Sequence, residues 1–152
     1  MIFYTYFATP PAIQSIPSYI ISGTPNLDTG DVIRLKSWQG DYLYRPDTAD
    51  GVTTRHTGIG NLWTVVRKDD SIQLKSLKGD YLRRADTDQG ITTGNKDLEN
   101  SWEINWNENK ISLKSSKGDF LHRAESGKGV TTQQNGAGSN WSVEIVASGK
   151  IL

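Results

Sequence analysis

Short stretches of alternating apolar and polar residues follow one another along most of the chain. Residues 33–36, Ile-Arg-Leu-Lys, alternate with the period of a half-buried β-strand. A polar turn containing Gly40 follows, and residues 42–43, 52–54 and 63–66 are three further short stretches typical of strands, separated by polar turns. Because helical periodicity is missing from this pattern, it predicts four short strands.

The same pattern occurs three times without a gap, at residues 31–69, 70–108 and 109–147. Twelve of the 39 positions carry the same residue in all three units, among them a tryptophan near the end of each. One unit alone leaves its apolar residues exposed, whereas three units around a common axis bury them at roughly 1.5–3 kcal/mol for each large side chain. The residues expected in this core are Ile33, Leu35, Leu43, Val52, Trp63, Val65 and their counterparts in the other repeats.

Three units of four strands narrow the choice among all-β architectures. A propeller needs about four blades to close. Three units close instead as a β-trefoil, in which a six-stranded barrel is capped by three hairpins. The sequence therefore predicts an all-β fold of twelve strands with pseudo-three-fold symmetry, spanning residues 31–152.

Residues 1–30 differ in kind from the repeats and are predicted to form a separate N-terminal arm. Asp28 is their one charged residue, and the segment is rich in Phe and Tyr. Four prolines argue against a helix and against a central strand. We expect the arm to lie extended across the trefoil or across a second copy, which would make a homodimer. A membrane-interacting arm is the alternative.

Composition excludes several classes of function. The chain has 17 basic and 17 acidic side chains, so it lacks the positive charge that nucleic-acid binding favours. The absence of cysteine removes disulfides and thiolate metal sites. No apolar run reaches the roughly 18 residues of a membrane span, and the N-terminus lacks a basic region typical of a signal peptide. We expect a protein without cofactor that is cytoplasmic, or released without a recognisable signal peptide.

Residues suited to catalysis are sparse. The two histidines, His56 and His122, stand at different positions of the repeat and are expected on the surface. A pair of carboxylates of the glycosidase type is left open, because the distance between the two groups defines it. The sequence predicts no catalytic residue, no metal site and a protein that is not an enzyme.

Several polar columns recur in the repeats, and the aspartate, arginine and acidic columns among them allow two interpretations. In the structural one, the aspartate after the turn glycine caps the turn and the arginine bridges neighbouring repeats. In the binding one, each repeat carries a polar pocket that recognises sugar hydroxyls by charge-assisted hydrogen bonds. The residues predicted to bind carbohydrate are Asp41, Arg45, Asp47, Asp80, Arg84, Asp86, Asp119, Arg123 and Glu125.

The repeats also resemble a known group of proteins. Ile-x-Leu-Lys-Ser-x-x-Gly-Asp-Tyr-Leu, followed by Gly-Val-Thr-Thr and Trp-x-Val, is similar to repeats of fascin-like β-trefoils, including the hisactophilins and the amaranthin-type agglutinins. The resemblance covers residues 31–147 and implies a β-trefoil that binds either actin or sugars. The Gln-x-Trp motif of ricin-type lectins and the histidine-rich loops of hisactophilin are both missing.

We expect a multivalent, lectin-like protein with up to three equivalent weak sites, whose partners are glycans or glycoproteins. The symmetry of the polar columns suits small repeated ligands, and neutral charge offers no basic patch for acidic actin. Two alternatives remain: a fascin-like module that binds or crosslinks actin, and the receptor-binding component of a toxin or defence protein.

Overall fold

The fold is described by a computed structural model in which residues 27–47, 52–85, 91–94, 100–125, 129–134 and 136–149 are placed. Most of the predicted arm, residues 1–26, lies outside the described residues, as does Asp86. The architecture of the arm and the dimer predicted through it therefore stay predictions.

Within the described residues the chain forms twelve strands and two short 3₁₀ turns. The four strands of each repeat fall where the alternation of the sequence predicts them. In the first repeat they are β1 (Val32–Lys36), β2 (Tyr42–Tyr44), β3 (Thr53–Arg55) and β4 (Trp63–Lys68). The others are β5 (Ser71–Lys75), β6 (Tyr81–Arg84), β7 (Ile91–Gly94), β8 (Trp102–Asn107), β9 (Lys110–Lys114), β10 (Phe120–Arg123), β11 (Val130–Gln133) and β12 (Trp141–Ala147), with turns η2 (Ile59–Asn61) and η4 (Ala137–Ser139).

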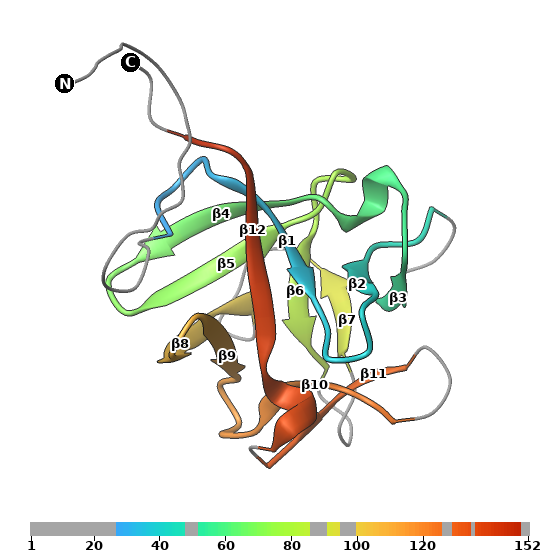
Figure 1. The fold of residues 1–152 in the computed structure, drawn as a ribbon. Coiled ribbons are helices and arrows are strands. Elements are labelled where there is room, and N and C mark those ends of the chain that lie inside the picture. The colour runs from blue at the N-terminus through green and yellow to red at the C-terminus, as the bar shows by residue number, and fades with distance from the viewer. Residues whose placement is uncertain are drawn as a thin grey trace, which may run out of the picture.

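Six of the strands close into a barrel. The antiparallel pairs β1–β4, β4–β5, β5–β8, β8–β9, β9–β12 and β12–β1 form a complete cycle. The remaining strands pair as three hairpins, β2–β3, β6–β7 and β10–β11. Figure 1 shows β12, in red, lying beside β1, in blue, so the last strand of the chain closes on the first. The fold is the twelve-stranded, trefoil-like arrangement that the repeats predict.

The predicted core is largely confirmed. The isoleucine and leucine of β1, β5 and β9, the first strand of each repeat, are buried, as is the leucine of each hairpin. Val52 and its counterparts Ile91 and Val130 are only partly buried, and they pack against this core from the hairpins. Val65 is fully buried, whereas its counterparts Ile104 and Val143 are partly exposed.

The three repeat tryptophans tie each hairpin to the barrel. Trp63, Trp102 and Trp141 are fully buried. Each donates its indole N–H to the carbonyl of the hairpin leucine 20 residues earlier, over 3.1 Å. A buried indole therefore keeps its hydrogen bond while its rings fill the core.

The two ends of the described chain meet beside the barrel. Leu27, from the predicted arm, is fully buried in the core. The Asp31 carboxylate accepts the backbone N–H of Asp28 at 2.9 Å and that of Gly149 at 2.7 Å. The core thus takes in the last residues of the predicted arm. In the described part of the chain, no helix has the length and apolar character needed to cross a membrane.

Replacing Trp102 by Ala should lower the free energy of unfolding by roughly 3–5 kcal/mol, because it leaves a large cavity and an unpaired Leu82 carbonyl. That loss is a large part of the 5–15 kcal/mol typical of a domain. Urea unfolding at equilibrium measures it. The exposed Glu103→Ala serves as the control; a Trp102→Ala protein within about 1 kcal/mol of the wild type would contradict the core assignment.

Candidate functional site

The predicted arginine and aspartate columns meet across the junctions between repeats. Each arginine forms two parallel hydrogen bonds to the carboxylate of the next repeat, at 3.1–3.2 Å from Nε and 2.7–2.8 Å from Nη2. Its Nη1 donates to the carbonyl of the residue that follows it in the chain, at 2.6–2.7 Å. The three pairs, here called the junction ring, are Arg45–Asp80, Arg84–Asp119 and Arg123–Asp41.

The turn before each of these aspartates holds its carboxylate in place. In the first repeat, the hydroxyl of Ser37 donates to the Asp41 carboxylate and accepts the backbone N–H of Gln39. The turn also needs Gly40, whose φ of +93° is strained for residues with a side chain. Ser-x-x-Gly-Asp is thus recurrent because it builds one half of the junction.

Electrostatics matches this geometry. Burial alone would raise the pKa of Asp41, but the hydrogen bonds from Arg123 and Ser37 outweigh it and lower the pKa from 3.8 to about 2. The pKa values of Asp80 and Asp119 are lowered too, against the opposing effect of burial, by their arginine and serine partners. The ring carboxylates are therefore ionised at neutral pH and already matched with donors.

The third predicted column lies outside the ring. Asp47 is exposed, with one carboxylate oxygen 3.8 Å from the Lys78 ammonium. Glu125 is also exposed, and its backbone carbonyl accepts the side-chain amide of Gln39 at 2.9 Å. The structure thus brings the arginine and aspartate columns together between neighbouring repeats rather than within one repeat. The contacts support the structural interpretation of the ring, and carbohydrate binding by these residues stays a prediction.

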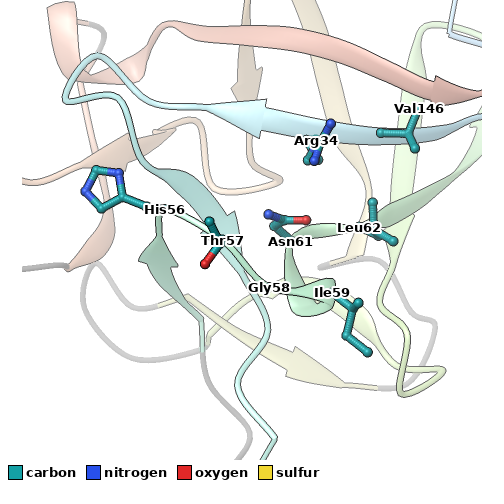
Figure 2. Close-up of a pocket in the computed structure, with 8 residues that line it drawn as sticks. All are labelled: Arg34, His56, Thr57, Gly58, Ile59, Asn61, Leu62 and Val146. Atoms are coloured by element: carbon teal, nitrogen blue, oxygen red, sulfur yellow. The ribbon is translucent and has the colours of Figure 1, made fainter.

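A separate pocket lies where the first repeat meets the last strand (Figure 2). Its volume is about 370 Å³, and Arg34 on β1 and Val146 on β12 face the loop that leads into η2. That loop contributes polar groups at His56, Thr57 and Asn61 beside the apolar Ile59 and Leu62; Gly58 completes the lining. We call this pocket the seam pocket. Polar side chains and an aliphatic surface line it together.

Arg34 belongs to a polar cluster along the same seam. Its Nε lies 3.4 Å from a Glu144 carboxylate oxygen, and its guanidinium lies over the Tyr42 ring, 5.6 Å from the centroid. Tyr42 donates its hydroxyl to Glu144 at 2.8 Å, which raises the pKa of the phenol. Within the described residues Arg34 Nε makes no hydrogen bond. Charge and the aromatic ring thus position the guanidinium.

This cluster breaks the repeat symmetry. On the β1–β12 seam Arg34 faces Glu144. The counterpart pairs are Gln73 with Val66 and Ser112 with Asn105. Since neither of these carries a charge, the fold does not require Arg34 and Glu144. The sequence signal for Arg34 and Glu144 is that they stand in columns where the three repeats differ, whereas only the recurring polar columns were predicted to form a site.

The loop below the pocket is fixed by close packing. The backbone N–H of Arg45 donates to the Gly60 carbonyl at 2.8 Å. A Cβ atom on Gly60 would lie 2.4 Å from the Arg45 carbonyl oxygen, and one on Gly58 would lie 2.8 Å from the Tyr44 ring. Only glycine fits at these two positions, so the loop carries Thr57 and Asn61 in a set geometry.

The two histidines have different environments. His56 is exposed, as predicted, and lines the seam pocket. The surface prediction for His122 is wrong: its ring is buried, its Nδ1 lies 3.1 Å from the Ser139 hydroxyl, and burial lowers its pKa. Its counterpart Tyr44 is buried as well, whereas Arg83, which occupies this position in the second repeat, is only partly buried. The described residues contain no cluster of three or more His, Cys, Asp or Glu able to hold a metal ion.

A second hollow, of about 380 Å³, lies between the second and third repeats. Its lining consists of hydroxyls and charged groups, including Glu103 paired in register with Lys114. It has no large apolar side chain, so it lacks the mixed character of the seam pocket.

No family description and no curated protein sequence matches the chain. Solved structures do match its fold. An endo-β-galactosidase from Clostridium perfringens that releases GlcNAcα1-4Gal aligns with a TM-score of 0.66 and 18% identity, over 76% of this chain and 32% of that one. A Polyporus squamosus lectin bound to Neu5Acα2-6Galβ1-4GlcNAc aligns with a TM-score of 0.66 and 16% identity, over 78% of this chain and 50% of that one.

The cytolethal distending toxin of Haemophilus ducreyi aligns with a TM-score of 0.66 and 14% identity, over 80% of this chain and 87% of that one. At these identities the likenesses show the fold alone. They support a trefoil fold of the kind found in lectins and toxins, and the finer resemblance to fascin and hisactophilin stays a prediction.

One prediction is corrected by these comparisons. The scarcity of residues suited to catalysis led us to expect a protein that is not an enzyme, and the match to an endo-β-galactosidase contradicts this expectation. The same fold occupies part of an endo-β-galactosidase, whose chain is about three times as long as the aligned region. The trefoil therefore does not exclude an enzyme.

Asp41→Asn should lower the free energy of unfolding by about 3–5 kcal/mol, because it leaves the Arg123 guanidinium buried without its counter-ion. Asp47→Asn removes an exposed carboxylate and should cost less than about 1 kcal/mol. Urea unfolding compares the two. Equal small effects would show that the ring does not hold the repeats together.

Acid should weaken the fold in a defined range. The Asp41 pKa is lower in the folded chain than its ordinary value of 3.8, so its stabilising effect is complete above about pH 4 and is lost as the pH falls through about 2. The loss for Asp41 is on the order of 2 kcal/mol. Unfolding in urea from pH 6 to about 2 measures it, and Asp41→Asn should flatten the profile. A stability unchanged over this range would contradict the ring.

Proposed function

We propose that the protein binds carbohydrate at the seam pocket. The observation that carries the proposal is the lining of this pocket, where Arg34 and Asn61 lie beside an aliphatic surface. Figure 2 shows Asn61 between Thr57 and Leu62, on the side of the pocket that faces Arg34. The likeness to a lectin bound to a glycan is consistent with this function.

Sugars are recognised by groups of this kind. A guanidinium donates several hydrogen bonds in one plane and can span two neighbouring hydroxyls. The exposed Thr57 hydroxyl can both donate and accept. Asn61 lines the pocket as well, but it is only 3% exposed, so its amide offers the ligand a small polar surface. The exposed Ile59 and Val146 offer an apolar surface for the C–H face of a sugar ring. A volume of about 370 Å³ suits a small ligand.

The site is single rather than repeated three times. Arg34 and Glu144 have uncharged counterparts at the other two seams, so one pocket of this chemistry is expected per chain. A shallow single pocket predicts weak binding of one sugar, and strong attachment would then require several copies or a second contact.

A role as the receptor-binding component of a toxin is the second candidate. The alignment with the Haemophilus ducreyi toxin over most of both chains favours it. The same pocket would serve if the receptor were a glycan, so the two functions share their chemistry. Actin binding, dimer formation through residues 1–30 and the cellular location stay predictions.

Arg34→Gln should weaken glycan binding at the seam pocket while leaving the fold intact, because glutamine occupies the equivalent position, Gln73, in the second repeat. We expect a loss of at least about tenfold in affinity, the equivalent of one charge-assisted hydrogen bond. The measurement is a glycan array with galactose-, mannose- and N-acetylhexosamine-terminated ligands, followed by titration calorimetry. Lys75→Gln, which removes an exposed charge away from the pocket, is the matched control.

Two results would contradict the proposal. Glycan binding by the wild type that Arg34→Gln leaves unchanged would show that the seam pocket is not the site. Loss of binding in Asp41→Asn at a pH and temperature where the variant is folded would point to the junction columns. Saturable actin co-sedimentation without any glycan response would favour the fascin-like alternative.

A further inference from the structure

A half-exposed tryptophan stands at the junction between the third and the first repeat. Trp38, in the turn after β1, is 46% exposed. Its indole N–H donates to the backbone carbonyl of Arg123 over 3.1 Å. The polar atom of the indole is therefore satisfied within the protein, and the ring is held in one orientation across the junction. What Trp38 leaves to solvent is apolar ring surface.

The fold does not require an aromatic side chain at this position. Its counterparts are Leu77, which is 54% exposed, and the exposed Ser116. All three turns have the same backbone hydrogen bonds, at 2.7 and 3.0 Å, and the same glycine φ of +91° to +93°. The turn at a junction therefore keeps the same backbone geometry when serine replaces the aromatic side chain. A need to shield the Arg–Asp pair from solvent therefore does not explain the aromatic side chain of Trp38.

The surroundings of Trp38 favour an uncharged polar ligand. Its neighbour Gln39 donates a side-chain N–H to the Glu125 carbonyl, which brings the exposed Glu125 to the same junction. The charges beneath, on Asp41 and Arg123, neutralise each other. An exposed aromatic face at a junction that also carries the exposed Glu125 suits a sugar ring, which offers a C–H face and hydroxyl donors.

We propose that Trp38 is a stacking platform for the apolar face of a pyranose ring, with the Glu125 carboxylate accepting one of its hydroxyls. The inference rests on the proposed function for the class of ligand, but not on the seam pocket, which is lined by other residues. The chain then has two different sugar contacts. Two weak contacts on one chain can engage a branched or clustered glycan with an avidity that neither gives alone.

The experiment follows the indole N–H signals of the tryptophans by ¹H–¹⁵N NMR. The probe is methyl β-D-galactopyranoside, whose axial O4 leaves one continuous C–H face, and methyl α-D-mannopyranoside is the comparison. We expect the Trp38 signal to shift in a saturable way, with a Kd of about 1 mM or weaker. The signals of the buried Trp63, Trp102 and Trp141 should stay in place.

Exchanging the side chains of two repeats provides matched variants. Trp38→Leu installs the side chain that the second repeat carries at the same turn, so it should fold with an unchanged melting temperature and weaken this contact about tenfold or more. Leu77→Trp should create a second responsive indole, since Arg45 occupies the same place at the Leu77 junction as Arg123 does at the Trp38 junction. Glu125→Gln should weaken the contact by a smaller factor.

The outcomes separate this inference from the proposed function. A Trp38 signal that does not respond to either sugar overturns the platform, even if Arg34→Gln weakens binding on the glycan array. A response that persists in Arg34→Gln and disappears in Trp38→Leu supports it as an independent contact. Undiminished sugar binding by a folded Trp38→Leu protein overturns it as well.

Discussion

The junction ring is the interaction on which the rest of the structure depends. Each arginine engages both oxygens of a carboxylate in the next repeat, and the side chains of the three arginines are only 5–7% exposed. The pair Arg123–Asp41 closes the cycle between residues 82 positions apart. A buried charge without its partner is costly, and each arginine finds its partner only in the next repeat. Each repeat therefore depends on its neighbours for stability. The ring also positions the surface: the backbone N–H of Arg45 holds the seam-pocket loop, and the Arg123 carbonyl holds Trp38.

The residues that maintain the three-fold symmetry of the fold differ from those that are candidates for binding. The positions that are identical in all repeats supply the turns, the ring and the core, because closing the barrel needs the same contact at each junction. The candidate binding groups lie where the repeats differ. Arg34 has the counterparts Gln73 and Ser112, and Trp38 has Leu77 and Ser116. A ligand needs its site only once, so a change in one repeat can add a binding group without disturbing the contacts that the fold needs three times.

The similar structures illustrate how little a trefoil alone says about activity. A lectin, a toxin and part of an endo-β-galactosidase share this fold with the chain at 18% identity or less. Function on such a scaffold has to be argued from the chemistry of a site. In this chain a guanidinium, an amide and aliphatic side chains meet at one seam, and an aromatic face is exposed at one junction.

The sequence by itself determined the strands, most of the core and the trefoil-like closure, since these follow from local alternation and from the count of repeats. It also showed that Asp41, Arg45 and their counterparts matter, but not which of them meet. Identity between repeats reveals that a residue type is needed three times; the partner is decided when the barrel closes and brings Arg45 to Asp80 rather than to an aspartate of its own repeat. The tertiary structure alone decided that His122 faces inward and that Arg34, Asn61 and Val146 share one pocket. Such contacts join residues far apart in the chain, so no local pattern encodes them.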